Sequence, residues 1–347
     1  MKIGVLGYAD HSGLGTMTAS LIRNLGAVRH LAPSNKGKTG VWPLDLAPET
    51  RRCETWTPPA DAVDWFLSGL DCVLTVETDY GADLATEAKK RGVKAIHIPM
   101  WEYWGDPPIY PGYAAYIAVS KYGYRCIPSD WPRHYLPWPI DLAQFPFTPR
   151  GVTSGAPIFL HAAGHTVQSN RKGTAQVIRG FAQTTVEATL LLLSQRPLAD
   201  FPADCATLIQ RDRRIQLVDR ELPNPQDCYA AGDFFVFPSR LEGHAMVTLE
   251  AMACGLVPIT TDAAPMNEFD LPAACYLPAF EAEQGHFQGM NFPKWEVSNA
   301  DMAKAFTEAT KIPVRYWSPI MRNYIAGCYS WEALGALWRS TIEVACA

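Results

Sequence analysis

Residues 232–262 read GDFFVFPSRLEGHAMVTLEAMACGLVPITTD. Phe234 to Phe237 form an apolar, aromatic run of strand length, and a polar loop follows it. Ala245 to Cys254 are rich in strong helix formers and stop at Gly255, a residue type that favours the backbone conformation found after helix C-termini. Val257 to Thr260 predict the next buried strand. The stretch therefore predicts a strand–loop–helix–strand unit of the kind that builds parallel sheets.

Two carboxylates, Glu242 in the loop and Glu250 in the helix, stand eight positions apart. A predicted helix N-terminus lies between them, with the backbone N–H groups of Gly243, His244, Ala245 and Met246. A helix N-terminus carries partial positive charge and attracts anions. Glu250, about two turns into the helix, can accept hydrogen bonds from the vicinal hydroxyls of a ribose. The alternative for two such glutamates is a solvated Glu242 and a surface-paired Glu250.

The string PSRLEGHAMVTLEAMACGLVPITT, residues 238–261, resembles the donor-site signature of retaining GT-B glycosyltransferases of the glycogen-synthase-like type (family 4, glycosyltransferase group 1). That signature runs Pro-Ser, Glu-Gly and then Glu-Ala-Met-Ala-x-Gly-x-Pro, with the two glutamates in E-x7-E spacing; in this chain two residues separate Gly255 from Pro258. The resemblance implies an α/β protein of GT-B fold, with two Rossmann-like domains facing each other across a cleft and a C-terminal helix that crosses back to the first domain. It also implies retaining transfer of a sugar from a UDP- or GDP-linked donor to a hydroxyl acceptor, with no metal or other cofactor.

Length and composition agree with a two-domain enzyme. The 347 residues suffice for about two cores, and 48% apolar with 19% charged residues is typical of a globular protein. The net charge of −5 gives no overall attraction to nucleic acid or anionic lipid. The absence of a long apolar run or signal peptide, with nine scattered cysteines, predicts a cytoplasmic protein. We expect an acceptor-binding domain over 1–145, a nucleotide-sugar-binding domain over 146–328 and a helix over 329–347 that packs back on the first domain.

The first domain opens with a predicted strand, Ile3 to Tyr8, a turn containing Gly13 and Gly15, and a helix from Thr16 to Leu25. Thr18 stands where a dinucleotide fingerprint needs its third glycine, so the turn is not that motif. In the family resembled, this loop lies near the acceptor and the donor phosphates, and a plain tight turn is the alternative. Polar residues that follow predicted strands are acceptor-site candidates. The candidates are Asp10, His11, Glu77, Trp101 and Glu102.

Two of these regions allow a second interpretation. Glu77-Thr78-Asp79 could hold a metal, but one acidic triplet is weak evidence and no metal site is predicted. Trp101 and Glu102 either form an aromatic platform for a sugar or pack beneath a proline-rich loop. A basic and aromatic stretch over 121–138 is typical of single-stranded nucleic-acid grooves, although a helix edge and connector explain it better.

The second domain is expected to start with a strand from Pro157 to Ala163 and the loop Gly164 to Gly173. The family carries Lys-Gly at the following helix start, where the lysine neutralises the donor diphosphate, and Lys172 matches it. His165 replaces the family's arginine, so Arg171 would supply the second cation. The resemblance also points to nucleobase binding near Asp219. Residues 278–296 are predicted to be irregular, and three helices should follow over 299–311, 314–327 and 330–345.

The predicted catalytic residues are thus Glu242, Lys172 and Arg171, and the predicted donor-binding residues are Gly13, Gly15, Gly164, His165, Asp219, Gly243, His244, Ala245, Met246 and Glu250. The acceptor stays open among sugars, natural products, proteins and modified DNA bases, and the sequence does not address the oligomeric state. A catalytically silent nucleotide-sugar-binding protein and a sugar-nucleotide epimerase are the competing functions.

Overall fold

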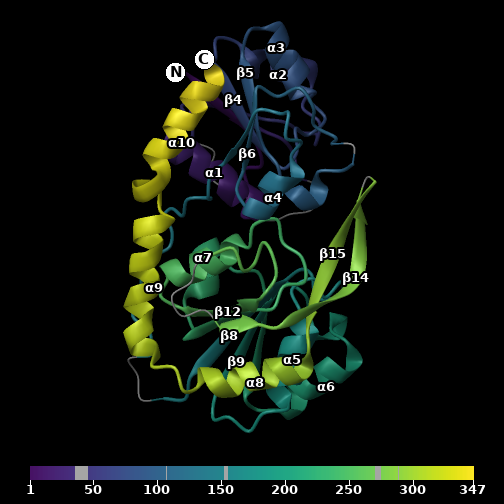
Figure 1. Ribbon diagram of the computed structural model, residues 1–347, viewed down its shortest axis with the longest axis vertical. Helices are drawn as coiled ribbons and strands as arrows, with labels where there is room; N and C mark the ends of the chain where they lie inside the picture. The colour runs from purple at the N-terminus through teal and green to yellow at the C-terminus, as the bar shows by residue number, and fades with distance from the viewer. Residues whose placement is uncertain (36–45, 107, 152–154, 270–274, 288) are drawn as a thin grey trace. The chain divides into compact units, whose positions relative to one another are not determined.

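The computed structural model describes residues 1–35, 46–106, 108–151, 155–269, 275–287 and 289–347. The chain divides into two compact units, each with its own parallel sheet (Figure 1). The first unit comprises Met1–Asp141, Phe287–Met290 and Ser330–Ala347, and the second comprises Leu142–His286 and Asn291–Tyr329.

The first unit contains a seven-stranded sheet in the order β3-β2-β1-β4-β5-β6-β7. Its strands are β1 (Ile3–Leu6), β2 (Arg29–Ala32), β3 (Glu49–Arg52), β4 (Cys72–Val76), β5 (Lys94–Ile98), β6 (Ala115–Ala118) and β7 (Arg133–Tyr135). Its helices are α1 (Gly13–Leu25), α2 (Ala60–Leu67), α3 (Leu84–Lys90), η1 (Trp101–Tyr103), α4 (Lys121–Cys126) and α10 (Trp331–Cys346). Central strands such as β4 are buried along their whole length, as expected where helices cover both faces of a parallel sheet.

Helix α1 begins earlier than the sequence predicted. Ser12 is its N-cap, and the Ser12 hydroxyl accepts a hydrogen bond from the backbone N–H of Gly15 at 3.1 Å. The helix therefore begins at Gly13 rather than at Thr16, and it ends at Gly26, whose φ of 66° is the left-handed conformation that stops a helix.

The stretch that follows β6 is structural. Ser120 caps the short helix α4, and β7 then adds a seventh strand to the sheet. Arg133 donates to the carbonyl oxygens of Tyr124 and Ile127 at 2.9 and 2.7 Å. Its guanidinium also lies 4.4 Å from the centre of the Tyr124 ring, an arrangement that favours the connector interpretation over a nucleic-acid groove.

Helix α10 belongs to the first unit, in line with the predicted return of the terminal helix. Its N-cap is Ser330, the first residue of the helix predicted over 330–345. The indole N–H of Trp331 donates to the Ser20 hydroxyl of α1 at 2.7 Å, and that of Trp338 donates to the Pro137 carbonyl at 3.1 Å. Buried indoles need such acceptors, so these bonds fix both position and rotation of the helix.

The second unit contains a six-stranded parallel sheet in the order β10-β9-β8-β11-β12-β13. The strands are β8 (Ile158–Gly164), β9 (Thr189–Ser194), β10 (Ile215–Asp219), β11 (Phe234–Phe237), β12 (Val257–Thr261) and β13 (Cys275–Leu277). The helices are α5 (Thr174–Ala182), η2 (Leu198–Asp200), α6 (Ala203–Arg211), η3 (Pro225–Tyr229), α7 (Met246–Ala253), α8 (Asn299–Ala309) and α9 (Val314–Cys328). The predicted strand–loop–helix–strand unit is thus β11, α7 and β12.

Two arginines fix the C-terminal end of α7. Arg150 is 7% exposed and donates to the carbonyl oxygens of Tyr229, Ala230 and Cys254. Arg322 of α9 donates to the Ala253 carbonyl at 3.0 Å. Cations are favourable at a helix C-terminus, so these contacts hold the helix and, through it, the loop at its other end.

Residues 278–296 are not irregular as predicted, because they form a two-stranded hairpin of β14 (Ala279–Phe287) and β15 (Met290–Val297) (Figure 1). Its charged residues and Pro293 hid the strand pattern. A two-stranded ribbon consists only of edges, where proline and charged side chains are tolerated. The hairpin is tied to the loop after β11, since Arg240 contacts Glu283 at 3.0 Å and the N–H of Trp295 donates to the Arg240 carbonyl.

Both sheets contain a topological switch point, where the order of the strands reverses. In the first unit the chain runs outward from β1 to β2 and β3 and then returns to β4, and in the second it runs from β8 to β10 and returns to β11. Helices on opposite faces leave a crevice at the carboxyl ends of the strands at such points, which is where open α/β sheets bind ligands.

Candidate functional site

The loops at the switch point of the second unit hold the predicted catalytic residues. His165 to Gly173 follow β8, and Pro238 to Ala245 follow β11, the neighbouring strand. Parallel strands place these two loops at the same edge of the sheet, so residues about 70 positions apart meet.

Glu242 is the centre of this arrangement. One carboxylate oxygen lies 2.7 Å from the ammonium of Lys172 and 2.5 Å from the hydroxyl of Ser239. The other lies 3.5 Å from the guanidinium of Arg171. The glutamate is 8% exposed, so the contacts with both cations are largely shielded from water.

Burial and charge act on Glu242 in opposite directions. Burial alone raises the pKa of a carboxyl group, but Lys172 and Arg171 outweigh it and leave the pKa of Glu242 below its usual value. The group is therefore a carboxylate at neutral pH. The Lys172 ammonium also lies 4.7 Å from the centre of the Phe237 ring, which further restricts the position of its charge.

Backbone contacts hold the two loops together. The Arg240 N–H donates to the Arg171 carbonyl at 2.8 Å, and the Arg171 guanidinium donates to the Leu241 carbonyl at 2.9 Å. Gly173 has a φ of 68°, and a Cβ there would lie 2.2 Å from the Pro238 carbonyl oxygen. Only glycine fits this approach, which explains the Lys-Gly pair physically.

His161 on β8 supports the same loops, although the sequence gave no reason to select it. One ring nitrogen lies 2.8 Å from the Val236 carbonyl of β11 and the other 2.9 Å from the Thr174 hydroxyl at the start of α5. Burial lowers the pKa of His161 to about 4, so the ring is neutral and can donate one bond and accept the other.

Glu250 lies in α7 and is 5% exposed. The hydroxyl of Tyr229 donates to its carboxyl group at 2.5 Å. Burial raises the pKa of Glu250 to about 7, against the lowering effects of Tyr229 and of the Lys172 charge. Lys172 thus acts on both glutamates, one directly and one through its field. The surface-paired alternative for Glu250 was wrong because helix α7 is buried on this side.

The start of α7 fits an anion. The N-cap residue, Ala245, has a φ of 57° and no side chain that can cap the first turn. His244 is 6% exposed, and neither ring nitrogen has a partner among the described residues; burial lowers the pKa of His244 to about 3. The Thr248 hydroxyl is also buried without a described partner. Buried polar atoms of this kind call for a bound group or water.

The other predicted donor-binding residues occupy the same edges of the two sheets. Gly164 ends β8 with a φ of 58°, His165 follows it as an exposed side chain, and Asp219 is exposed at the end of β10. Gly243 is buried between Glu242 and His244, and Met246 is the first residue of α7. Gly13 and Gly15 open α1 in the first unit. No finding tests these ligand assignments, and they stay predictions.

The first-unit candidates form two groups. Asp10 is 5% exposed and accepts hydrogen bonds from Asn35 and from the N–H of Ser12, next to His11. Glu77 has a φ of 64° and lies near Tyr8, whose pKa is raised by burial and by the charges of Asp10 and Glu77. Non-glycine residues with positive φ are uncommon and concentrate at functional positions.

Trp101 and Glu102 form the second group and are only 3% and 4% exposed. Trp101 packs on Tyr122 of α4 at a ring distance of 4.7 Å. The tryptophans of this segment therefore pack in the interior, which is the second of the two predicted alternatives, and Trp101 offers no exposed platform for a sugar.

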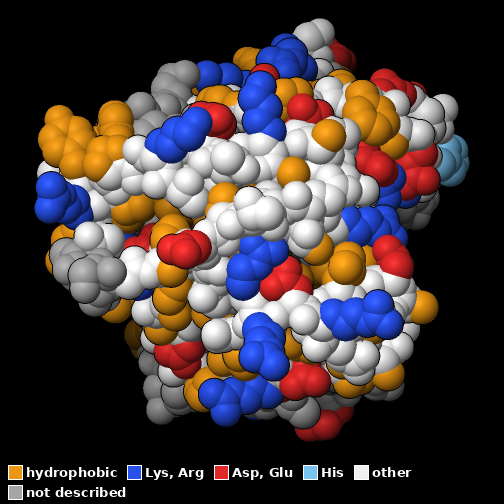
Figure 2. Space-filling view, turned by 90° about the horizontal axis from the view of Figure 1, so that it is seen from below, with side chains coloured by type: hydrophobic (Ala, Val, Ile, Leu, Met, Phe, Trp, Pro, Cys, Tyr) orange, Lys and Arg blue, Asp and Glu red, His pale blue; other side chains and the backbone are white. Residues whose placement is uncertain are grey.

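Three general features complete the description. Among the described residues, no group of three or more His, Cys, Asp or Glu side chains could hold a metal ion. No described helix has the length and apolar character needed to cross a membrane. Figure 2 shows one face of the molecule, on which Lys and Arg side chains are interspersed with Asp and Glu.

Sequence reasoning missed Tyr229, Ser239 and His161. Ser239 belongs to the Pro-Ser part of the motif, so its position was available as a signal. Tyr229 precedes β11 by a short loop, and only the packing of η3 on α7 places its hydroxyl at Glu250.

Comparison with known proteins agrees with this geometry. Residues 156–273 match the family model described as "Glycosyl transferases group 1". No curated protein matches the chain at a significant level. Sucrose-phosphate synthase from Thermosynechococcus elongatus superposes with a TM-score of 0.69 at 16% identity, covering 99% of this chain and 100% of that one. HepE of Anabaena, solved with UDP and glucose, superposes with a TM-score of 0.71 at 12% identity, covering 99% of this chain and 100% of that one. The lipopolysaccharide outer core galactosyltransferase WaaB superposes with a TM-score of 0.66 at 14% identity, and 99% of each chain is covered.

The structural matches span the whole chain and establish its fold. The family match covers the segment that contains Lys172, Glu242 and Glu250. The predicted resemblance is thus confirmed: the chain has the GT-B fold, and its second unit carries the sequence pattern of the group 1 glycosyltransferases.

Proposed function

We propose that this protein is a retaining, metal-independent glycosyltransferase that moves a sugar from a UDP- or GDP-linked donor to a hydroxyl acceptor. The observation that carries the proposal is the contact of Glu242 with Lys172 and Arg171, at a switch point and beside the start of α7. It combines an anion site with a fixed carboxylate, the two features that a nucleotide-sugar donor requires.

The anion site would hold the donor diphosphate. Lys172 and Arg171 supply two positive charges, and the first turn of α7 supplies backbone N–H groups that no side chain of the N-cap residue occupies. His244, neutral and buried, supplies a ring N–H. Donors fixed in advance stabilise the negative charge that develops on a leaving diphosphate, because no reorganisation is needed during the reaction.

Glu242 would act on the sugar itself. Its low pKa keeps it negative, and a carboxylate beside the ring stabilises the positive charge that develops at the anomeric carbon. Its contact with Lys172 sets the position of both charges before the donor binds. Glu250 would accept hydrogen bonds from the ribose hydroxyls through the oxygen that Tyr229 does not occupy.

In the proposed step, the bond between the anomeric carbon and the diphosphate oxygen breaks, and the acceptor oxygen bonds to the same carbon from the same face. The electron pair of the broken bond stays on the diphosphate, and that oxygen takes the proton of the acceptor hydroxyl. Charge and atoms balance without a metal or a protein base.

A thermal-shift panel of UDP, GDP, ADP and CMP tests the donor class, since a ligand that binds only the folded state raises the melting temperature. UDP has priority because HepE was solved with it. Incubation of the protein with the matching nucleotide sugars then measures release of nucleotide. Stabilisation with turnover supports the enzyme, stabilisation without turnover supports a silent binding protein, and the absence of both refutes the proposal. Salt-dependent retention of the protein on DNA would favour a modified-base acceptor.

A further inference from the structure

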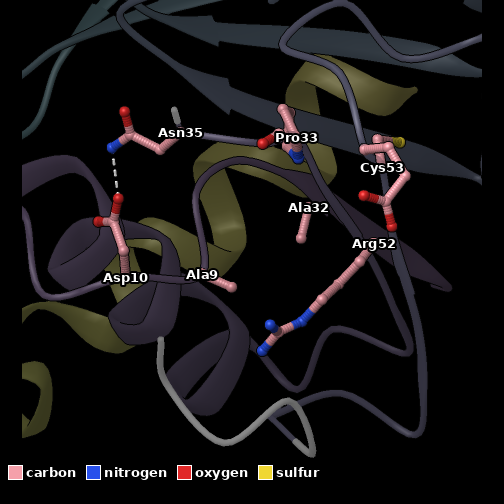
Figure 3. A pocket seen from close by; sticks show the side chains of 9 residues that line it. Ala9, Asp10, Ala32, Pro33, Asn35, Arg52 and Cys53 are labelled. Carbon is pink, nitrogen blue, oxygen red and sulfur yellow. Dashed lines mark hydrogen bonds between the residues drawn. The ribbon is translucent and has the colours of Figure 1, made fainter. Parts of the chain in front are cut away.

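The first unit contains a cavity of about 320 Å³ at the carboxyl ends of β1, β2 and β3 (Figure 3). It lies next to the switch point of that sheet and is formed by described residues of the first unit alone. The lining residues are Ala9, Asp10, Ala32, Pro33, Ser34, Asn35, Arg52, Cys53 and Glu54. The predicted acceptor residues included Asp10 but neither Asn35 nor Arg52.

The planar polar groups of Asp10, Asn35, Arg52 and Glu54 line this cavity. The carboxylate of Asp10 and the amide of Asn35 are hydrogen-bonded to each other on one side, and the guanidinium of Arg52 extends toward Ala9 on the other (Figure 3). Asp10 is held in place by the N–H of Ser12 and is 5% exposed, so its position does not depend on a ligand.

The chemistry of the lining fits hydroxyl groups. Arg52 only donates hydrogen bonds, Asp10 and Glu54 only accept them when ionised, and Asn35 does both. A hydroxyl group donates and accepts, whereas an ammonium only donates and a carboxylate only accepts. A neutral ring with several hydroxyls therefore uses all of these groups, while an anionic ring would face two carboxylates for one guanidinium.

The volume limits what the cavity can enclose. Small-molecule sites span about 300–1,000 Å³, so a cavity of about 320 Å³ is at the lower end of that range. It can enclose a single ring but not a nucleic-acid duplex or a folded protein.

We propose that this cavity binds one neutral, polyhydroxylated ring of the acceptor, with Asp10, Asn35 and Arg52 bonded to neighbouring hydroxyls. This inference rests on the proposed function for the identity of the ligand as an acceptor. The binding of the ring itself depends only on the first unit.

Saturation-transfer NMR with the full chain and UDP tests the inference, using methyl glucoside, methyl galactoside and methyl mannoside at millimolar concentration. Glucuronate and glucosamine are the charged probes. The matched variants are Arg52→Met and Arg51→Met, because the two arginines are neighbours on β3 but Arg51 pairs with Asp61 outside the cavity. Arg52→Lys keeps the positive charge but removes the planar guanidinium, so it tests whether the geometry of the donors matters. Melting temperatures show that each variant is folded.

We expect at least one neutral glycoside to bind the wild type and Arg51→Met with similar affinity. Its affinity for Arg52→Met should be lower by about tenfold or more. Equal binding to Arg52→Met, strongest binding of glucuronate or glucosamine, or no binding of any probe would overturn the inference. The proposed function fails separately, if no nucleotide stabilises the protein and no nucleotide sugar turns over while the glycosides still bind.

Discussion

The ammonium of Lys172 lies 2.7 Å from the carboxylate of Glu242, and these residues come from two loops that follow neighbouring parallel strands. The pair is largely buried, with side-chain exposures of 19% and 10%. The charge of Lys172 lowers the pKa of Glu242, and the contact fixes the two side chains at the site that we propose for the diphosphate-linked sugar. The first two predictions separate the structural and the functional role of this contact.

Lys172→Met should lower kcat/KM by about a hundredfold or more, because one fixed donor to a developing charge is lost. It should also lower the free energy of unfolding by about 1–3 kcal/mol, since the buried carboxylate of Glu242 loses the nearer of the two cations that contact it among the described residues. Turnover assays and urea titration measure the two effects. The control is Lys311→Met, which breaks an exposed pair with Glu308 and should change stability by less than about 1 kcal/mol.

The double variant Lys172→Met/Glu242→Gln should regain part of the lost stability, because the uncompensated charge is removed. Its turnover should stay as low as that of Lys172→Met or fall further. Recovery of turnover together with stability would show that the lysine serves only the fold.

Glu250 should make stability depend on pH. Because the pKa of Glu250 is raised to about 7 in the folded state, the native protein binds the proton more tightly than the unfolded chain. The contribution of this group is therefore fully present below its unfolded pKa of about 4.3 and is lost as pH rises to about 7. Over that window the free energy of unfolding should fall by up to about 3 kcal/mol more in the wild type than in Glu250→Gln. Parallel pH profiles for the two proteins would contradict this assignment.

Two buried histidines should respond differently to replacement by phenylalanine. His161→Phe leaves the Val236 carbonyl and the Thr174 hydroxyl without their partner, and should cost about 1–3 kcal/mol of stability for each group left unsatisfied. His244→Phe removes no hydrogen bond to a described residue, so its melting temperature should stay near that of the wild type. Its affinity for the nucleoside diphosphate should instead fall about tenfold, measured by calorimetry. A large loss of stability in His244→Phe with unchanged affinity would assign it to the core.

Ala245→Gly should stabilise the protein. Ala245 has a φ of 57°, a conformation that costs an L-residue about 1–2 kcal/mol and glycine almost nothing, and the greater freedom of glycine in the unfolded chain offsets part of the gain. We expect a net increase of about 0.5–1 kcal/mol in the free energy of unfolding. Ala251→Gly, inside α7, should change stability in the opposite direction by about 1 kcal/mol. A destabilised Ala245→Gly would show that the strain is compensated locally.

Prediction from sequence worked best where a local pattern and the fold agree. The predicted bounds of β11, α7 and α10 lie within a residue or two of the observed bounds. Buried central strands and capped helices carry strong local signals in the sequence. Prediction failed for the hairpin of β14 and β15 and for β7. These are short or exposed edge elements, whose stability comes from their neighbours rather than from their own pattern.

The sequence by itself determined the fold and the chemical character of the proposed donor site, since the spacing of Glu242 and Glu250 and the Lys172-Gly173 pair are properties of the linear chain. Only the tertiary structure decided which residues meet: Lys172 with Glu242, Tyr229 with Glu250, and Asp10, Asn35 and Arg52 around one cavity. The physical reason is that strand order brings together loops that the sequence separates, and burial there sets the charge of each group. A linear pattern records residue types but neither the strand order nor the exclusion of water.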